Sequence, residues 1–248
     1  MNLLTVEGLT KHYPGFALRD VAFSLPQGKI MGLIGTNGAG KTTTLKSMLR
    51  LVRPDSGSIT LFGRSFPENE ESCKQSLGVV LGGIDFYHHK KLAAITAVTR
   101  RFYRNWDEGA YQSYLKAFAL DPQKRVRELS SGMKVKYMLA LALSHQARLL
   151  ILDEPTSGLD PVARDDLLRL FRQLVKEGDR SILFSTHITS DLEKCADHIS
   201  YLKDGTLLKS AEKSAFLQSF EHLKAPGETA LLSLEEIMIR SERKDNDI

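Results

Sequence analysis

The sequence predicts an α/β fold in which mostly parallel strands form the core and a helical subdomain is inserted at about residues 85–147. Two observations carry this prediction. A glycine-rich loop at residues 35–42 lies between an apolar strand and an amphipathic helix, and beyond Arg148 apolar strands alternate with helical segments. The chain has 248 residues, 42% of them hydrophobic, so it can bury a large core.

The first part of the chain, to about Gly63, has the pattern of a β-rich region. Turn signals at Pro14-Gly15 and Asp55-Ser56-Gly57 separate short apolar runs, as expected for paired strands. The expected strands are 4–8, 21–25, 29–34 and 58–62. After the glycine-rich loop, apolar residues recur at helical spacing, which predicts a helix that continues until Pro54.

Helices and strands alternate in the later part of the chain. Helical spacing covers residues 106–120 and 131–145, and the second of these segments begins at a serine cap. We then expect strands at 149–152 and 181–185 with a helix at 161–177 between them. Asp204-Gly205 predicts a β-hairpin that joins 199–203 to 206–208. The polar residues from about Ser241 onward are expected to be frayed.

The glycine-rich loop matches the pattern G-x-x-x-x-G-K-[S/T], whose backbone N–H groups enclose a phosphate group. Lys41 should reach the β- and γ-phosphates, and the Thr42 hydroxyl should bind Mg²⁺. The alternative is a glycine-rich turn that only caps a helix, and the motifs downstream weigh against it. The candidate nucleotide-binding residues are Gly35, Thr36, Asn37, Gly38, Ala39, Gly40, Lys41, Thr42 and Thr43.

Two carboxylates follow the apolar strand at residues 149–152. Asp153 is placed to hold Mg²⁺ through its water shell, and Glu154 is placed to act as the general base that polarises an attacking water. Taken alone, the pattern would favour a strand that runs into an acidic loop and is stopped by Pro155. The preceding phosphate loop favours the first interpretation.

A second anion site is indicated at the start of the helix at 131–145. The Ser130 and Ser131 hydroxyls, the Gly132 N–H group and the helix N-terminus together can bind an anion, although the same residues could simply cap the helix. His187 follows the strand at 181–185. A lone histidine is more often structural, but in this position His187 is a candidate sensor of the γ-phosphate.

In their order and spacing, these motifs resemble those of an ABC-transporter ATPase subunit, over about residues 3–217. The resemblance implies a P-loop core with an N-terminal antiparallel β subdomain, followed by a C-terminal extension at 218–248 that is related to dimer formation. It further implies that Tyr13 stacks on adenine, that His187 contacts the γ-phosphate, and that Asp160 lies in the loop called the D-loop. Lys41, Glu154 and His187 are the implied catalytic residues. Ser130, Ser131 and Gly132, the signature segment, would bind ATP held by the opposite protomer.

This sequence departs from the family pattern in two places. Ser131 and Met133 stand where the signature usually has a second glycine and a glutamine, and Ser131 still provides a small residue and a backbone donor. The stretch at 77–83 lacks the glutamine that the family usually carries there, and Asp85 is a candidate substitute. The missing glutamine, together with the segments at 102–107 and 233–237, resembles the bacterial subgroup that exports drugs, antibiotics or peptides.

The resemblance implies ATP and Mg²⁺ as cofactors, a separate integral membrane subunit, and either a homodimer or a heterodimer with a paralogue. The chain would then lie in the cytoplasm on the inner face of the membrane, since we find no secretory signal or membrane-spanning stretch. A formal charge of +4 without a nucleic-acid motif predicts no nucleic-acid partner. The alternatives are a soluble ABC-type ATPase outside transport and an ATP-gated regulatory module that barely hydrolyses ATP.

Overall fold

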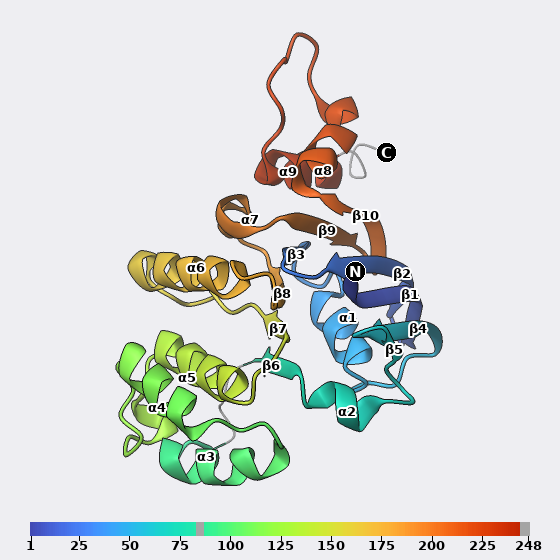
Figure 1. Cartoon of the computed structure of the whole chain (residues 1–248). Coiled ribbons are helices and arrows are strands. Elements are labelled where there is room, and N and C mark those ends of the chain that lie inside the picture. The colour runs from blue at the N-terminus through green and yellow to red at the C-terminus, as the bar shows by residue number, and fades with distance from the viewer. Residues whose placement is uncertain (83–86, 244–248) are drawn as a thin grey trace.

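The computed structural model describes residues 1–82 and 87–243. In these ranges the strands form one curled sheet of ten strands, in the order β5-β4-β1-β2-β10-β9-β3-β8-β7-β6 (Figure 1). The strands are β1 (Asn2–Tyr13), β2 (Phe16–Pro26), β3 (Ile30–Ile34), β4 (Ser56–Leu61), β5 (Arg64–Ser65), β6 (Leu77–Leu81), β7 (Leu149–Asp153), β8 (Ser181–Thr186), β9 (His198–Lys203) and β10 (Thr206–Glu212).

The sheet has a parallel half and an antiparallel half, as predicted. β6, β7, β8, β3 and β9 run parallel, whereas β5, β4, β1 and β2 pair antiparallel at the N-terminal edge. β3 and β8 are buried along their whole length, which explains why their sequences are nearly continuous apolar runs. The α/β class with mostly parallel core strands is therefore confirmed.

The helices cover both faces of the parallel half and form a separate lobe below it (Figure 1). They are α1 (Lys41–Met48), α2 (Glu70–Lys74), α3 (Leu92–Thr99), α4 (Glu108–Ala117), α5 (Ser131–Ser144), α6 (Pro161–Val175), α7 (Thr189–Cys195), α8 (Lys213–Ser219) and α9 (Leu234–Arg243). Short 3-10 helices join them, among them η2 (Arg100–Phe102), η3 (Val126–Glu128) and η4 (Glu221–Leu223). No helix in residues 1–82 and 87–243 is both long and apolar enough to cross a bilayer.

The helical subdomain, built from α3, α4 and α5, has its own small core. The Thr96 hydroxyl shares hydrogen bonds with the hydroxyls of Tyr111 and Tyr137, at 2.7 and 2.8 Å. Because these groups are buried, the pKa of Tyr137 is raised well above its usual range. The ring of Tyr103 stacks on that of His145, the C-cap residue of α5, with centroids 3.6 Å apart.

The structure corrects two boundaries. The helix after the glycine loop ends at Met48 rather than continuing to Pro54, because Arg50 takes a left-handed backbone conformation (φ 56°). The domain division expected between residues 217 and 218 lies within the range of α8 and stays a prediction. α9 continues to Arg243, so residues 241–243 are helical rather than frayed. The remaining residues of the expected frayed end lie outside the described ranges.

Candidate functional site

The phosphate loop connects β3 to α1 and lines a cavity of about 480 Å³. Its backbone conformation depends on glycine. Gly40, the residue before α1, has φ 104°, and a Cβ atom there would lie 2.7 Å from the ring of Phe16. The cavity is lined by Phe16, Thr36, Asn37, Gly38, Gly40, Lys41, Thr42, Thr43 and Glu154. Its volume falls in the usual range for small-molecule sites.

Lys41 lies almost fully buried at the base of this cavity. Its ammonium group donates hydrogen bonds to the carbonyl oxygens of Gly35, at 2.8 Å, and Thr36, at 3.1 Å. The same nitrogen lies 3.6 Å from Oε1 of Glu154. A buried positive charge on a loop rich in N–H groups creates a local field that favours a polyphosphate.

Thr42 and Asp153 are brought together from α1 and β7. The Thr42 hydroxyl donates to Oδ2 of Asp153 at 2.8 Å, and the Ser185 hydroxyl donates to its other oxygen, Oδ1. A hydroxyl and a carboxylate oxygen are the hard ligands that Mg²⁺ prefers. Within residues 1–82 and 87–243, no three His, Cys, Asp or Glu side chains are grouped to hold a metal alone. The pair therefore fits an ion that takes its other ligands from phosphate and water.

Glu154 stands between two basic groups. Its Oε2 atom lies 2.9 Å from Nδ1 of His187, whereas its other oxygen, Oε1, is the one near Lys41. The Glu154 backbone is left-handed, with φ 49°, and its N–H donates to the carbonyl oxygen of Ser185 at 3.1 Å. This turn directs the carboxylate to the cavity that it lines. The structure thus brings together Lys41, Glu154 and His187, the three candidate catalytic residues.

Tyr13, the candidate for stacking on adenine, does not line this cavity. It ends β1, is 41% exposed, and has the Lys11 ammonium 5.7 Å from its ring centroid. Phe16 pairs with Tyr13 across the hairpin and lines the cavity in its place. Sequence reasoning missed Phe16, although an aromatic residue just after the Pro14-Gly15 turn was a signal that could have found it. Tyr13 remains a prediction.

The signature segment and Asp160 form a second group that does not line the cavity. The Ser130 hydroxyl caps α5 by accepting from the Met133 N–H at 3.3 Å, and Ser131 is exposed beside it. Asp160 caps α6, and hydrogen bonds from backbone N–H groups, that of Ala163 above all, lower its pKa. A Cβ atom on Gly132 would contact Leu159 at 3.4 Å, so the two helix N-termini lie side by side.

Phe16 provides a test of how the cavity binds a base. Stacking of a base on an aromatic ring contributes about 1–3 kcal/mol, so Phe16→Ala should raise the Kd for ATP about tenfold. Equilibrium titration with a fluorescent ATP analogue would measure this change. Phe102→Ala is the matched control, since that ring is 71% exposed and lies outside the cavity. An unchanged Kd for ATP in Phe16→Ala would contradict stacking of the base on the Phe16 ring.

Comparison with known proteins gives a consistent result. The family profile described as "ABC transporter" matches residues 18–157, and an AAA-domain profile matches residues 125–190. The chain is 34% identical to the bacitracin transport ATP-binding protein BcrA of Bacillus licheniformis, over 90% of this chain and 71% of that protein. It is 35% identical to Nod factor export ATP-binding protein I of Burkholderia orbicola, over 82% of this chain and 68% of that protein.

Solved structures agree with these sequence relatives. A structure described as the ATP-binding subunit of an ABC transporter superposes with a TM-score of 0.82 at 28% identity, over 96% of this chain and 98% of that one. The chain therefore belongs to the ATP-binding subunits of ABC transporters. Members of this family bind and hydrolyse ATP and work with a membrane transport partner.

Proposed function

We propose that this chain is the ATP-hydrolysing subunit of an exporter that moves a drug, an antibiotic or a peptide-like substrate through a separate membrane subunit. The observation that carries the proposal is the placement of Glu154, which lines the phosphate-loop cavity between Lys41 and His187. The relative named for bacitracin transport supports the class of substrate, and the relative named for Nod factor export supports the direction of transport.

The polar side chains in and beside the cavity would have separate roles in hydrolysis. Lys41 and the loop N–H groups would bind the β- and γ-phosphates, and the charge of Lys41 would stabilise the transferring group. Thr42 and Asp153 would hold Mg²⁺, which neutralises phosphate charge when bound. Glu154 would orient the attacking water and accept its proton, while His187 would hold the Glu154 carboxylate and contact the γ-phosphate.

Two protomers would complete each site. The signature segment and Asp160 stand at the N-termini of α5 and α6, where the helix dipoles favour an anion, yet they do not line the cavity of their own chain. In a head-to-tail dimer, Ser130, Ser131 and Gly132 would bind the ATP of the opposite protomer. The pair would be two copies of this chain or this chain with a paralogue.

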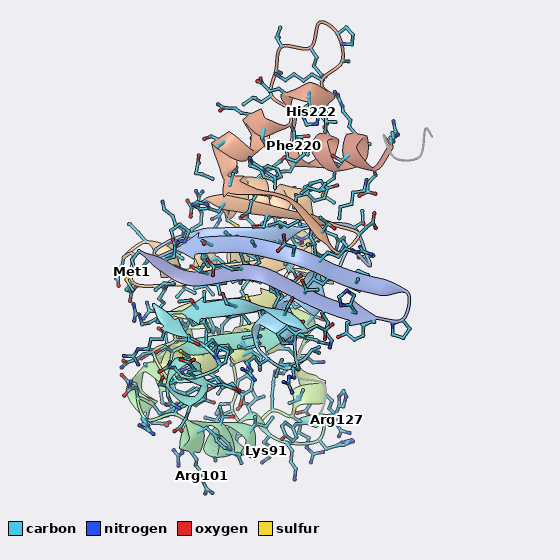
Figure 2. The ribbon with its side chains drawn as sticks, turned by 90° about the vertical axis from the view of Figure 1, so that its right-hand side faces the viewer. Met1, Lys91, Arg101, Arg127, Phe220 and His222 are labelled. Atoms are coloured by element: carbon cyan, nitrogen blue, oxygen red, sulfur yellow. The ribbon has the colours of Figure 1, made fainter. Side chains whose placement is uncertain are left out.

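The helical subdomain offers the surface for the membrane subunit. An apolar cavity of about 340 Å³ lies along α3 and is lined by Tyr87, Lys90, Ala94, Ile95, Val98, Thr99 and Phe102. Val98 is 56% exposed and Phe102 is 71% exposed. Lys91, Arg101 and Arg127 lie at the same end of the molecule (Figure 2). We propose that a cytoplasmic segment of the membrane subunit binds here and keeps the chain at the inner membrane face.

Val98→Glu tests this surface, because it places a charge in the apolar cavity without disturbing a buried residue. We expect loss of co-purification with the membrane subunit, while the Kd for ATP stays as in the parent protein. The matched control is Leu208→Glu, which adds the same charge at a residue of β10 that is 44% exposed. Retained co-purification in Val98→Glu would place the docking surface elsewhere.

A further inference from the structure

The phosphate loop is supported from behind by the turn that joins β9 to β10. A Cβ atom on Gly35 would lie 2.3 Å from the carbonyl oxygen of Leu202, so the two backbones are in direct contact. On the far side of the turn, the Gly205 N–H donates to the carbonyl oxygen of Ala39 at 3.0 Å. The loop therefore contacts residues 202–205 at two points, Gly35 and Ala39.

Side chains of β9 alternate between this loop and the C-terminal extension. Leu202 packs in the apolar cluster beneath the phosphate loop, with Leu33 and Leu45. Tyr201 packs in the cluster on the opposite face, with Phe216 and Phe220. Because successive residues of a strand point to opposite faces, Lys203 shares the face of Tyr201. In Figure 2, the labelled Phe220 belongs to the lobe at the end of the molecule opposite Arg101.

The C-terminal end of α9 contacts the side chains of Tyr201 and Lys203. The Lys203 side chain is 9% exposed, and its ammonium group donates to the carbonyl oxygen of Ser241 at 2.9 Å and lies 3.8 Å from Oε2 of Glu242. The Tyr201 hydroxyl donates to Oε1 of Glu242 at 3.3 Å. Carbonyl groups in the last turn of a helix lack partners within the helix, so a lysine there satisfies one of them and interacts favourably with the helix dipole.

α9 is itself fixed to the rest of the protein. Leu234 and Ile237 are fully buried, and the Leu234 N–H donates to Oε1 of Glu193 in α7 at 3.0 Å. Arg240 forms two hydrogen bonds with Glu228, at 2.6 and 2.9 Å. α9 is thus held in a fixed position where Lys203 contacts it. A continuous series of contacts leads from α9 through Lys203 and the 202–205 turn to the phosphate loop.

We propose that Lys203 is a positioning residue of the nucleotide site, and that α9 acts through it and the 202–205 turn to hold the phosphate loop in its phosphate-binding conformation. The C-terminal extension then sets the affinity for ATP without touching the nucleotide. A partner that displaced α9 would weaken ATP binding, and bound ATP would in turn favour the docked helix, since such coupling is reciprocal.

The test uses Lys203→Met, which keeps the bulk of the stem and removes the charge, and Glu242→Gln, a milder change at the partner. We expect both variants to raise the Kd of a non-hydrolysable ATP analogue, and the KM for ATP, about fivefold, with kcat unchanged. Lys203→Arg should restore the parental Kd. In the double variant the two effects should be less than additive, because Lys203→Met already removes the ion pair with Glu242 that Glu242→Gln weakens.

The matched control is Lys224→Met in the same extension. Lys224 is similarly covered, with a side chain 16% exposed, and pairs with Glu221 but not with β9. Its Kd for the analogue should equal that of the parent protein. The proposal is overturned if Lys203→Met and Glu242→Gln, folded by circular dichroism, bind the analogue as tightly as Lys224→Met. Loss of ATP binding in Lys224→Met to the same degree would also overturn it, by showing a general effect of the extension.

Discussion

Glu154→Gln is expected to lower ATP hydrolysis about a hundredfold or more while ATP still binds, because a general base contributes about 10²–10⁴ to the rate. The amide keeps the shape of the side chain and its place between Lys41 and His187, but it cannot accept the proton of the attacking water. Phosphate release under saturating ATP measures the first effect. With hydrolysis blocked, we expect ATP-bound protomers to accumulate as closed dimers in size-exclusion chromatography.

The control for this variant is Glu177→Gln, an equal change at an exposed residue just after α6. It should hydrolyse ATP at the parental rate. If Glu154→Gln also hydrolysed ATP at that rate, Glu154 would not be the base, and the contact with His187 would have to serve another purpose.

Lys41→Ala is expected to remove ATP binding, with the Kd raised about a hundredfold or more, since hydrogen bonds to charged groups contribute about 1.5–3 kcal/mol each. The substitution also leaves two loop carbonyl oxygens without their donor and Glu154 without a nearby positive charge. Calorimetric titration with ATP would give the Kd, and thermal unfolding would show whether the variant is folded.

Lys46→Ala provides the comparison on the same helix, because Lys46 is exposed on α1 and does not line the cavity. This variant should bind ATP as the parent protein does. Tight ATP binding by a folded Lys41→Ala protein would refute the role of Lys41.

Most of the core could be predicted from the sequence because its signals are local. The strand expected at 149–152 is β7 (Leu149–Asp153), and the helix expected at 161–177 is α6 (Pro161–Val175), where Asp160 caps the first turn and Pro161 occupies its start. β6 (Leu77–Leu81) was not predicted, since two glycines bound its apolar run and only its pairing with β7 shows it to be a strand.

The candidate site was predicted in its residues but not in its contacts. Motif order indicated Glu154 and His187 separately, whereas their 2.9 Å contact depends on the parallel pairing of β7 with β8. Phe16 and Lys203 were missed because each acts through its position in a hairpin, which no motif records. The suggestion that Asp85 replaces the missing glutamine lies outside the described residues. An unchanged ATPase rate in Asp85→Ala would refute it.

The central claim, that ATP binding and hydrolysis here drive a membrane transporter, is tested most directly by purification from native membranes. Tagged Glu154→Gln would be isolated from detergent extracts with ATP present, and its companions would be identified by mass spectrometry. We predict a membrane protein with several spanning helices, absent from the Lys41→Ala sample. Recovery of only soluble proteins or nucleic acid would contradict the transporter assignment and favour an ABC-type ATPase that acts outside transport.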